Sequence, residues 1–286
     1  MQFAELDMPR LSDQFNTEGY VILKDVFDRK ILSAVQAEMK QLVDGHAQRL
    51  VSSGKVKSLF LDEPFETRLF RLYEGCLDEA PKLFRAELHG AGMYFPFFHP
   101  ELLDVAEAIL GGEIRLYPNY SARPKLPDWE GTRVLWHQDG GYTEQMKSGD
   151  GNSVETLRMM NAWTPLVPAR VENGCMQFIP GTHKLGTVPH LSKQYYLEIA
   201  PEHLAVRAEQ AVNVELDPGD VVLFHNLLFH QGLPNQSKSI RWSLDWRYQD
   251  ATQPTMRREN GHMARSREHP ETEVRSPEHW ASLSFC

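Results

Sequence analysis

Apolar residues recur at helical spacing in two segments of the first part of the chain. After Asp28, whose side chain can cap a first turn, apolar positions three and four residues apart predict a helix that ends at Ser52–Gly54. Pro100–Leu110 is predicted to form a second helix, with proline in its first turn and Gly111 and Gly112 as its stop. Both helices need an apolar surface to pack against.

From Glu113 onward the pattern changes to short runs rich in β-branched and aromatic residues. Clusters of turn-forming residues separate the runs, and one such turn is expected at Arg123–Asp128. Many short strands with regular breaks favour a closed or sandwiched antiparallel β-fold with the N-terminal helices packed outside it. The predicted fold class is therefore mainly β with flanking α-helices. The expected strands are Ile114–Tyr120, Thr132–His137, Leu157–Leu166, Met176–Ile179, Ala211–Leu216, Val221–Phe229 and Ile240–Tyr248.

A single domain spanning residues 1–286 is the expected organisation. No linker rich in Pro, Ser or Gly and no block of charge divides the chain before about residue 250, and β-folds of this length often remain undivided. Within this domain we expect a helix-rich N-terminal part (1–112), a β core (113–250) and a charged, irregular C-terminal tail (251–286). The tail either wraps the core or is partly loose.

Composition narrows the class of protein and its compartment. With 41% hydrophobic and 10% aromatic residues, the chain has the content of an ordinary folded protein. Met1–Phe15 lacks the apolar centre of a secretory signal, and no apolar run approaches the roughly 18 residues of a membrane span. Cys76, Cys175 and Cys286 form neither a disulfide framework nor a CxxC metal site, so a cytoplasmic location is expected. The formal net charge of −9 argues against a general nucleic-acid or anionic-membrane surface.

The first candidate for chemistry is a His-x-Asp sequence at the end of an expected strand. On an extended backbone, residues i and i+2 face the same way, so His137 and Asp139 can present an imidazole and a carboxylate to one point while Gln138 faces away. Gly140 and Gly141 follow, and they allow a sharp turn and a close approach. A His-x-Asp sequence also occurs by chance in many proteins, where an ordinary surface pair is the more common explanation.

A later apolar run, 219–232, contains two further candidate ligands, His225 and His230. If Pro234–Ser237 is the tight connection of a hairpin, residue 230 stands opposite 241 and residue 228 opposite 243. His230, Arg241 and Ser243 then share one face of the hairpin, and His225 falls on the other. We therefore choose His230 as the ligand, unless a bulge shifts the register.

Two histidines and one carboxylate are the ligand set typical of non-haem iron(II) oxygenases, which leave coordination positions open for a co-substrate and dioxygen. Zinc more often takes three or four His or Cys ligands. A dicarboxylate co-substrate that chelates iron through one end needs a cation at its other end. The planar guanidinium of Arg241 suits that carboxylate, and Ser243 can add a hydroxyl donor, although Arg241 taken alone could equally be a surface strand residue.

Three motifs agree in order, spacing and residue type with a known family. They are His137–Asp139, the segment Asn173–His183, and His230 followed eleven residues later by Arg241. From about residue 19 to residue 248, the sequence resembles the phytanoyl-CoA dioxygenase family of iron(II)- and 2-oxoglutarate-dependent oxygenases. The resemblance implies a double-stranded β-helix, or jelly roll, with helices packed against one sheet.

The resemblance also implies the roles of individual residues. The family's iron ligands correspond to His137, Asp139 and His230, and its partner for the 2-oxoglutarate carboxylate corresponds to Arg241. Ser243 matches a hydroxyl residue that some members place beside this arginine. The residues expected to bind the co-substrate are Arg241, Ser243 and Trp163; a buried core tryptophan is an equally good interpretation of the last.

Two neighbouring residues are assigned no role in catalysis. His183 is similar to a family residue that does not bind iron, and Cys175 resembles a buried strand residue without redox function. Related halogenases replace the carboxylate ligand with a small residue, so the presence of Asp139 favours hydroxylation.

The implied activity uses Fe(II), 2-oxoglutarate and O2 to hydroxylate a small-molecule metabolite, with oxidative decarboxylation of 2-oxoglutarate to succinate and CO2. The substrate and the oligomeric state stay open. Two other classes remain possible: a metal-dependent hydrolase or isomerase on the same fold, which would not need Arg241, and a binding module without turnover.

The segments considered for the substrate cavity are Lys55–Arg71, Tyr94–His99, Tyr117–Trp129 and Tyr142–Ser153. Phe95, Phe97, Phe98 and Trp129 could line an apolar pocket, although packing between helices is the commoner role for such residues.

Overall fold

Helices lie mostly before Gly111 and strands mostly after it, and the computed structural model describes residues 7–145, 153–194, 196–205 and 207–286. The helices are α1 (Met8–Glu18), α2 (Arg29–Ser52), α3 (Phe65–Tyr73), α4 (Tyr94–Phe97), α5 (Pro100–Leu110), α6 (Asp139–Gln145), α7 (Pro201–Leu204) and α8 (Pro277–Ser282). The strands are β1 (Tyr20–Leu23), β2 (Glu113–Leu116), β3 (Ser121–Lys125), β4 (Val134–His137), β5 (Met159–Pro165), β6 (Met176–Ile179), β7 (His190–Ser192), β8 (Leu197–Ile199), β9 (Val212–Val214), β10 (Val221–His225), β11 (Phe229–Gly232), β12 (Arg241–Asp250) and β13 (His262–Ser266).

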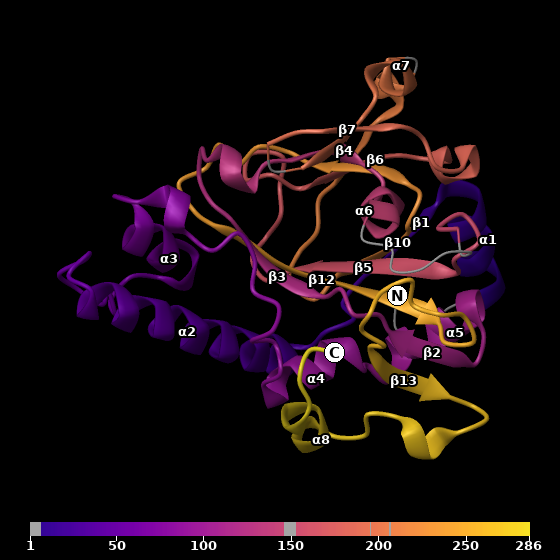
Figure 1. The fold of residues 1–286 in the computed structure, drawn as a ribbon, viewed down its shortest axis with the longest axis horizontal. Coiled ribbons are helices and arrows are strands. Elements are labelled where there is room, and N and C mark those ends of the chain that lie inside the picture. The colour runs from indigo at the N-terminus through magenta and orange to yellow at the C-terminus, as the bar shows by residue number, and fades with distance from the viewer. Residues whose placement is uncertain (1–6, 146–152, 195, 206) are drawn as a thin grey trace.

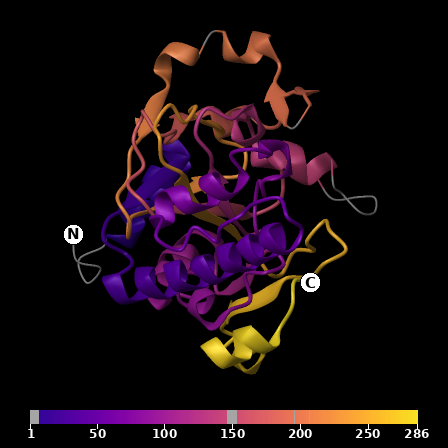
Figure 2. The same ribbon diagram turned by 90° about the vertical axis from the view of Figure 1, so that its left-hand side faces the viewer.

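Two antiparallel sheets form the centre of the molecule, and helices cover the outer side of the larger sheet (Figure 1). The larger sheet has the strand order β1-β10-β5-β12-β2-β13, and β3 also pairs with β12; the smaller sheet has the order β4-β11-β6-β9. In Figure 2, α2 lies across the near side, and the β7–β8 ribbon with α7 lies at the end of the molecule opposite α8. The predicted class, a mainly β jelly roll with flanking helices, is confirmed.

The principal hydrophobic core lies between the larger sheet and the helices. Trp242, Leu244, Trp246 and Tyr248 are alternate residues of β12, and each is completely buried in this core. Helix α2 contributes residues such as Met39 from its inward side. Because side chains alternate across a strand, the residues of β12 between these four face the space between the two sheets.

The two helices predicted from apolar spacing are confirmed. The side chain of Asp28 accepts a hydrogen bond from the Ile31 N–H (2.8 Å) and caps α2, which ends at Ser52. Helix α5 begins at Pro100 and is followed by Gly111, as predicted. Helices α1 and α3 and strand β1 also lie in the N-terminal part and were not predicted.

The expected hairpin that would pair His230 with Arg241 is wrong. His230 stands opposite His137 of β4 and Phe178 of β6, whereas Arg241 stands opposite Lys125 of β3 in the other sheet. The apolar run that was predicted as one strand breaks into β10 and β11 at residues 226–228, where the Leu228 N–H donates to the His225 carbonyl (2.9 Å). This turn carries the chain from the larger sheet to the smaller one, so β11 and β12 do not pair.

The turn expected at Arg123–Asp128 is also partly wrong, since β3 continues through Lys125 and pairs with β12. The strand expected at Ile114–Tyr120 ends at Leu116, just before Pro118. After residue 250, where an irregular tail was expected, β13 pairs with β2 and α8 buries Trp280 completely. In the part of the chain that the structure describes, no helix has the length and apolar content needed to cross a membrane.

Candidate metal centre

Pairing between β4 and β11 brings two histidines side by side. His137 is the last residue of β4 and stands opposite His230 of β11, with 4.0 Å between the centres of the two imidazole rings. Both residues are almost completely buried, at 5% and 3% exposure. Two neighbouring strands of one sheet therefore hold the imidazoles at a fixed separation.

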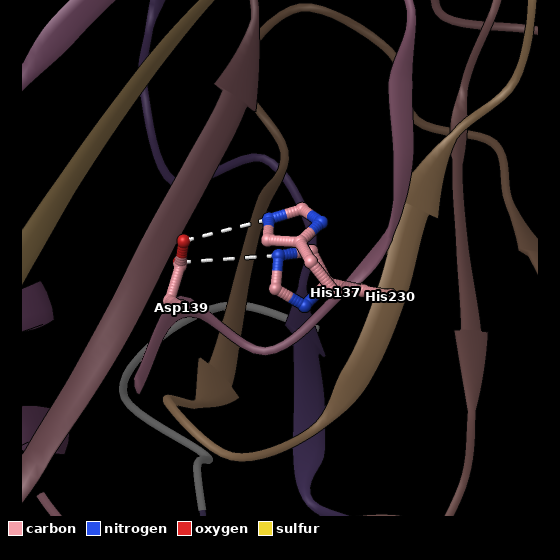
Figure 3. Close-up of side chains that lie close together, drawn as sticks. All are labelled: His137, Asp139 and His230. Atoms are coloured by element: carbon pink, nitrogen blue, oxygen red, sulfur yellow. Dashed lines mark ion pairs between the residues drawn. The ribbon is translucent and has the colours of Figure 1, made fainter. Parts of the chain in front are cut away.

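Asp139 approaches both imidazoles from the start of a helix. The assumption of an extended backbone is wrong at this position, because α6 begins at Asp139 immediately after β4. The Gly140 N–H donates to the Asn226 carbonyl (2.9 Å), which fixes this helix start against the turn between β10 and β11. Figure 3 shows the carboxylate pointing at the two rings, with 3.6 Å from Oδ1 to Nε2 of His137 and 3.9 Å from Oδ2 to Nε2 of His230. One ligand atom from each residue lies within 4.8 Å of the others.

The hydrogen bonds of the two histidines leave both Nε2 atoms available to a metal. Nδ1 of His137 bonds to the Leu135 carbonyl (2.7 Å), and Nδ1 of His230 bonds to the Leu228 carbonyl (2.8 Å). A carbonyl only accepts, so Nδ1 carries the proton and Nε2 presents its lone pair toward Asp139. Burial lowers the pKa of His230 to about 3, so this imidazole is neutral near pH 7.

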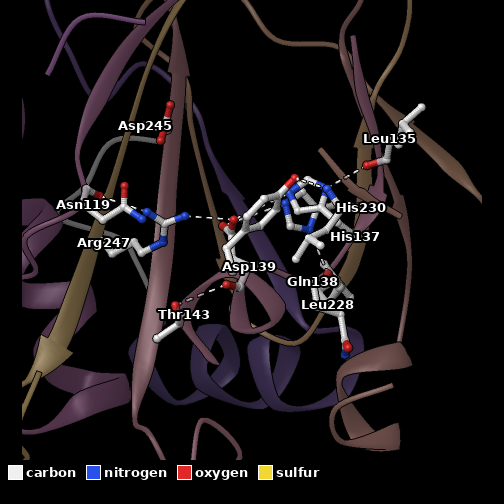
Figure 4. Close-up of polar contacts among 12 residues, drawn as sticks. Asn119, Leu135, His137, Gln138, Asp139, Thr143, Leu228, His230, Asp245 and Arg247 are labelled. Carbon is white, nitrogen blue, oxygen red and sulfur yellow. Dashed lines mark hydrogen bonds and ion pairs between the residues drawn. The ribbon is translucent and has the colours of Figure 1, made fainter. Parts of the chain in front are cut away.

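An arginine that the sequence analysis missed keeps the carboxylate ionised. Burial by itself raises the pKa of Asp139, but the positive charge of the neighbouring Arg247 holds it well below its usual value. The Nη2 atom of Arg247 lies 2.8 Å from Oδ1 of Asp139, and its Nη1 donates to the Asn119 carbonyl (3.1 Å), as Figure 4 shows. The missed signal was the alternation along β12, which places residue 247 on the same face as residue 241.

The three residues expected to bind the co-substrate lie together on the larger sheet. Nη1 of Arg241 donates to the Ser243 hydroxyl (2.6 Å), and its guanidinium lies 5.2 Å from the centre of a Trp163 ring. Arg241 is 4% exposed, and burial lowers its pKa to about 10. Among the described residues, no carboxylate forms an ion pair with Arg241. A buried cation without a counter-ion is costly, so this site favours an anionic ligand.

A cavity of about 280 Å³ joins the three candidate ligands to Arg241, and both sheets line it. Of the segments considered in advance, Tyr117–Trp129 contributes Asn119 and Arg123, and Tyr142–Ser153 contributes Tyr142, with residues 146–152 outside the described part. No described residue of Lys55–Arg71 or Tyr94–His99 lines the cavity. None of the four aromatic residues considered for an apolar pocket lines this cavity. The favoured interpretation, packing between helices, holds for the buried Phe97 and Phe98, whose rings contact Trp280.

The other candidate side chains lie elsewhere. The ring of His225 packs against Phe15 and His183, with ring centres 6.0 and 5.1 Å apart, and stands outside the group of potential ligands. The structure thus brings His230, and not His225, to Asp139, although the hairpin used to separate them does not exist. Cys175 is fully buried, and burial raises its thiol pKa to about 11.

Comparison with known proteins points to one family. The model of the phytanoyl-CoA dioxygenase family matches residues 15–243. A 1-deoxypentalenic acid 11-beta-hydroxylase from Streptomyces arenae is 29% identical over 267 residues, which cover 86% of this chain and 83% of the relative. The peroxisomal phytanoyl-CoA dioxygenase of Bos taurus is 27% identical over 53% of this chain and 44% of the relative.

Solved structures share the fold. EctD from S. alaskensis, determined with 2-oxoglutarate and 5-hydroxyectoine, superposes with a TM-score of 0.61 at 21% identity, covering 85% of this chain and 76% of EctD. The epimerase SnoN, determined with Fe3+, alpha ketoglutarate and nogalamycin RO, gives a TM-score of 0.58 at 23% identity, covering 87% and 86%. At this level of identity the likeness concerns the arrangement of the strands and helices.

Proposed function

The chain belongs to the phytanoyl-CoA dioxygenase family and is an iron- and 2-oxoglutarate-dependent oxygenase, and we propose that His137, Asp139 and His230 hold its iron. One observation carries this assignment: two imidazole nitrogens and one carboxylate converge within 4.8 Å at one cavity between the two sheets. Two nitrogens and one oxygen suit iron(II) and leave positions for other ligands, so the donor set fits the metal that the family uses.

We assign Arg241 to the distal carboxylate of 2-oxoglutarate. Its guanidinium is buried without a carboxylate partner among the described residues, and it faces the same cavity as the proposed iron ligands. The Ser243 hydroxyl, which now accepts from Arg241, can turn its proton toward the bound carboxylate. Trp163 flanks the guanidinium and keeps water from this end of the cavity.

When bound, iron(II) with 2-oxoglutarate and O2 supplies an oxidant able to hydroxylate a C–H group, while 2-oxoglutarate is converted to succinate and CO2. The residues of the chain orient and protect that chemistry. Leu135 and Leu228 hold the tautomer of the two histidines through their carbonyls, and Arg247 holds Asp139 in its ionised form. With a carboxylate at position 139, we propose hydroxylation as the outcome.

The substrate is a small molecule. A relative is named for a small organic substrate, 1-deoxypentalenic acid. The cavity of about 280 Å³ is slightly smaller than the roughly 300–1,000 Å³ typical of ligand pockets. Arg241 is buried and has no carboxylate partner in the described part of the chain, which favours this oxygenase over the hydrolase or isomerase alternative, because that alternative gives the arginine no role. The intact set of potential ligands favours it over a binding module.

Succinate formation tests the proposal. With Fe(II), 2-oxoglutarate and air, the protein should release succinate slowly even without added substrate, and His230→Ala should abolish this release. His225→Asn is the matched control, because an asparagine oxygen can take over the hydrogen bond that the Leu227 N–H gives to Nδ1 of His225. Release by His230→Ala at the wild-type rate would rule out the assignment of the ligands.

A further inference from the structure

Positive charge exceeds negative charge in the cavity. Four arginines line it (Arg85, Arg123, Arg241 and Arg247) against two aspartates (Asp139 and Asp245), a difference of two positive charges. Loading the site does not change this difference, because iron(II) brings two positive charges and 2-oxoglutarate two negative ones. A neutral substrate would therefore leave the loaded cavity with excess positive charge, and an anionic substrate would reduce it.

The ion pairs in the cavity show which arginine lacks a carboxylate partner. Asp139 is paired with Arg247 (2.8 Å) and Asp245 with Arg123 (2.6 Å). If Arg241 holds the co-substrate, as proposed above, Arg85 is left without a carboxylate among the residues that the structure describes.

Arg85 has the surroundings of an incomplete anion site. Its Nη2 donates to the side-chain oxygen of Asn119 (2.8 Å), while its Nε is buried without a hydrogen-bond partner. Burial lowers the pKa of Arg85 to about 10, and the positive charge of Arg123 contributes to the same shift. The surroundings of Arg85 therefore disfavour its positive charge. A bound anion would accept hydrogen bonds from the guanidinium of Arg85 and offset the repulsion between Arg85 and Arg123.

Apolar side chains in the same cavity suit a carbon skeleton. Leu83, Val134, Met176 and Phe224 line the same cavity and offer apolar surface. Arg123 still has a third of its side chain accessible, so it can join Arg85 at one anion. The planar fork of a guanidinium matches a carboxylate, which can accept two parallel hydrogen bonds.

We propose that Arg85, assisted by Arg123 and Asn119, binds a carboxylate of the substrate, so that the enzyme acts on a small free carboxylic acid with a compact apolar skeleton. This inference rests on the proposed function, because it takes Arg241 to be occupied by 2-oxoglutarate. A thioester or amide of the same acid lacks the negative charge and should bind more weakly.

A pair of fluorinated probes tests the carboxylate directly. Protein loaded with Mn(II) in place of Fe(II) and saturated with 2-oxoglutarate is titrated with 4-fluorobenzoate and, separately, with 4-fluorobenzamide, and binding is followed by fluorine NMR. The acid should bind about tenfold more tightly than the amide, and Mn(II) should broaden its fluorine signal. Arg85→Gln should remove the preference for the acid. Arg71→Gln, the same change at an exposed arginine on α3, should keep it.

Three outcomes would overturn the inference: no binding of the acid, equal binding of the acid and the amide, or an unchanged preference in Arg85→Gln. The contrast between acid and amide in the wild-type protein needs no variant, so it stands even if Arg85→Gln folds poorly. Binding of 2-oxoglutarate is measured separately on the same samples. If 2-oxoglutarate binds and the acid preference is missing, the substrate site is wrong while the oxygenase assignment survives; if 2-oxoglutarate itself fails to bind, the oxygenase assignment fails.

Discussion

The two faces of β12 carry side chains of opposite character. Toward the helices, the strand presents large apolar side chains such as Trp246, which are completely buried in the principal hydrophobic core. Toward the smaller sheet, the same strand presents Arg241, Ser243, Asp245 and Arg247, which line the cavity or contact residues that do. One strand therefore supports the fold on one face and forms the site on the other.

This division has a physical reason. Burying charged groups costs free energy, and the guanidinium Nε of Arg247 lies buried without a hydrogen-bond partner. The apolar layer on the opposite face stabilises the strand enough to offset this cost. Adjacent residues of β12 should consequently give different results when they are replaced. A change on the outward face, which packs against the helices, should lower stability. A change on the inward face, which lines the cavity, should lower ligand binding.

The largest effect is expected on the outward face. Trp246→Ala removes a completely buried indole from the principal core and should lower the free energy of unfolding by about 3–5 kcal/mol. Urea denaturation followed by circular dichroism measures this loss. The folded fraction should still bind 2-oxoglutarate with an affinity close to that of the wild type. A loss below about 1 kcal/mol would contradict the role given to this face.

On the inward face, Arg241→Met keeps most of the side-chain volume and removes the charge. The affinity for 2-oxoglutarate should fall about 100-fold, because a charge-assisted pair of hydrogen bonds is lost. The free energy of unfolding should change little, since the substitution removes a buried cation that has no carboxylate partner in the described part of the chain. Calorimetric titration of the Fe(II)-loaded protein under anaerobic conditions gives the affinity, and unchanged binding by the variant would assign the co-substrate to another cation.

Arg247→Met tests the support of Asp139 and should have a smaller effect. The guanidinium 2.8 Å from Oδ1 of Asp139 orients the carboxylate and holds it ionised, and loss of such a partner typically weakens metal binding by about 10- to 100-fold. Competition with a chelator measures the change in Fe(II) affinity. Metal affinity equal to that of the wild type would mean that Arg247 serves the fold or the substrate instead.

Ser243→Ala should have the smallest effect of the series. The hydroxyl accepts from Arg241 at 2.6 Å, so its removal takes away one hydrogen bond while the charge of the arginine stays. A loss of about 1 kcal/mol corresponds to a several-fold weaker affinity for 2-oxoglutarate. The same calorimetric titration applies, and an effect as large as that of Arg241→Met would show that the hydroxyl, and not the charge, determines binding.

The periodicity of the sequence was enough to predict the class of fold and the helices α2 and α5. The proposed ligands were found by a different signal, the spacing of His137, Asp139, His230 and Arg241 along the chain. The alternation along β12 was also readable, and it could have identified Arg247 once Arg241 had been placed in the cavity.

The arrangement of the strands in space was not readable. The break at residues 226–228 moves the chain from one sheet to the other, and the local pattern of apolar residues continues through this break. Arg85 was missed for a similar reason. It stands outside the named helices and strands, and its contact with Asn119 depends on tertiary packing between residues 34 positions apart.

The measurement that tests the central claim most directly is the visible absorption of the anaerobic protein after addition of Fe(II) and 2-oxoglutarate. A keto acid chelated to iron(II) gives a weak charge-transfer band, and this band requires that the metal and the co-substrate meet in one site. We expect the band in the wild-type protein and in His225→Asn, and we expect none in His137→Ala or His230→Ala. Absence of the band from the wild-type protein, or its full retention in either alanine variant, would contradict the proposed centre.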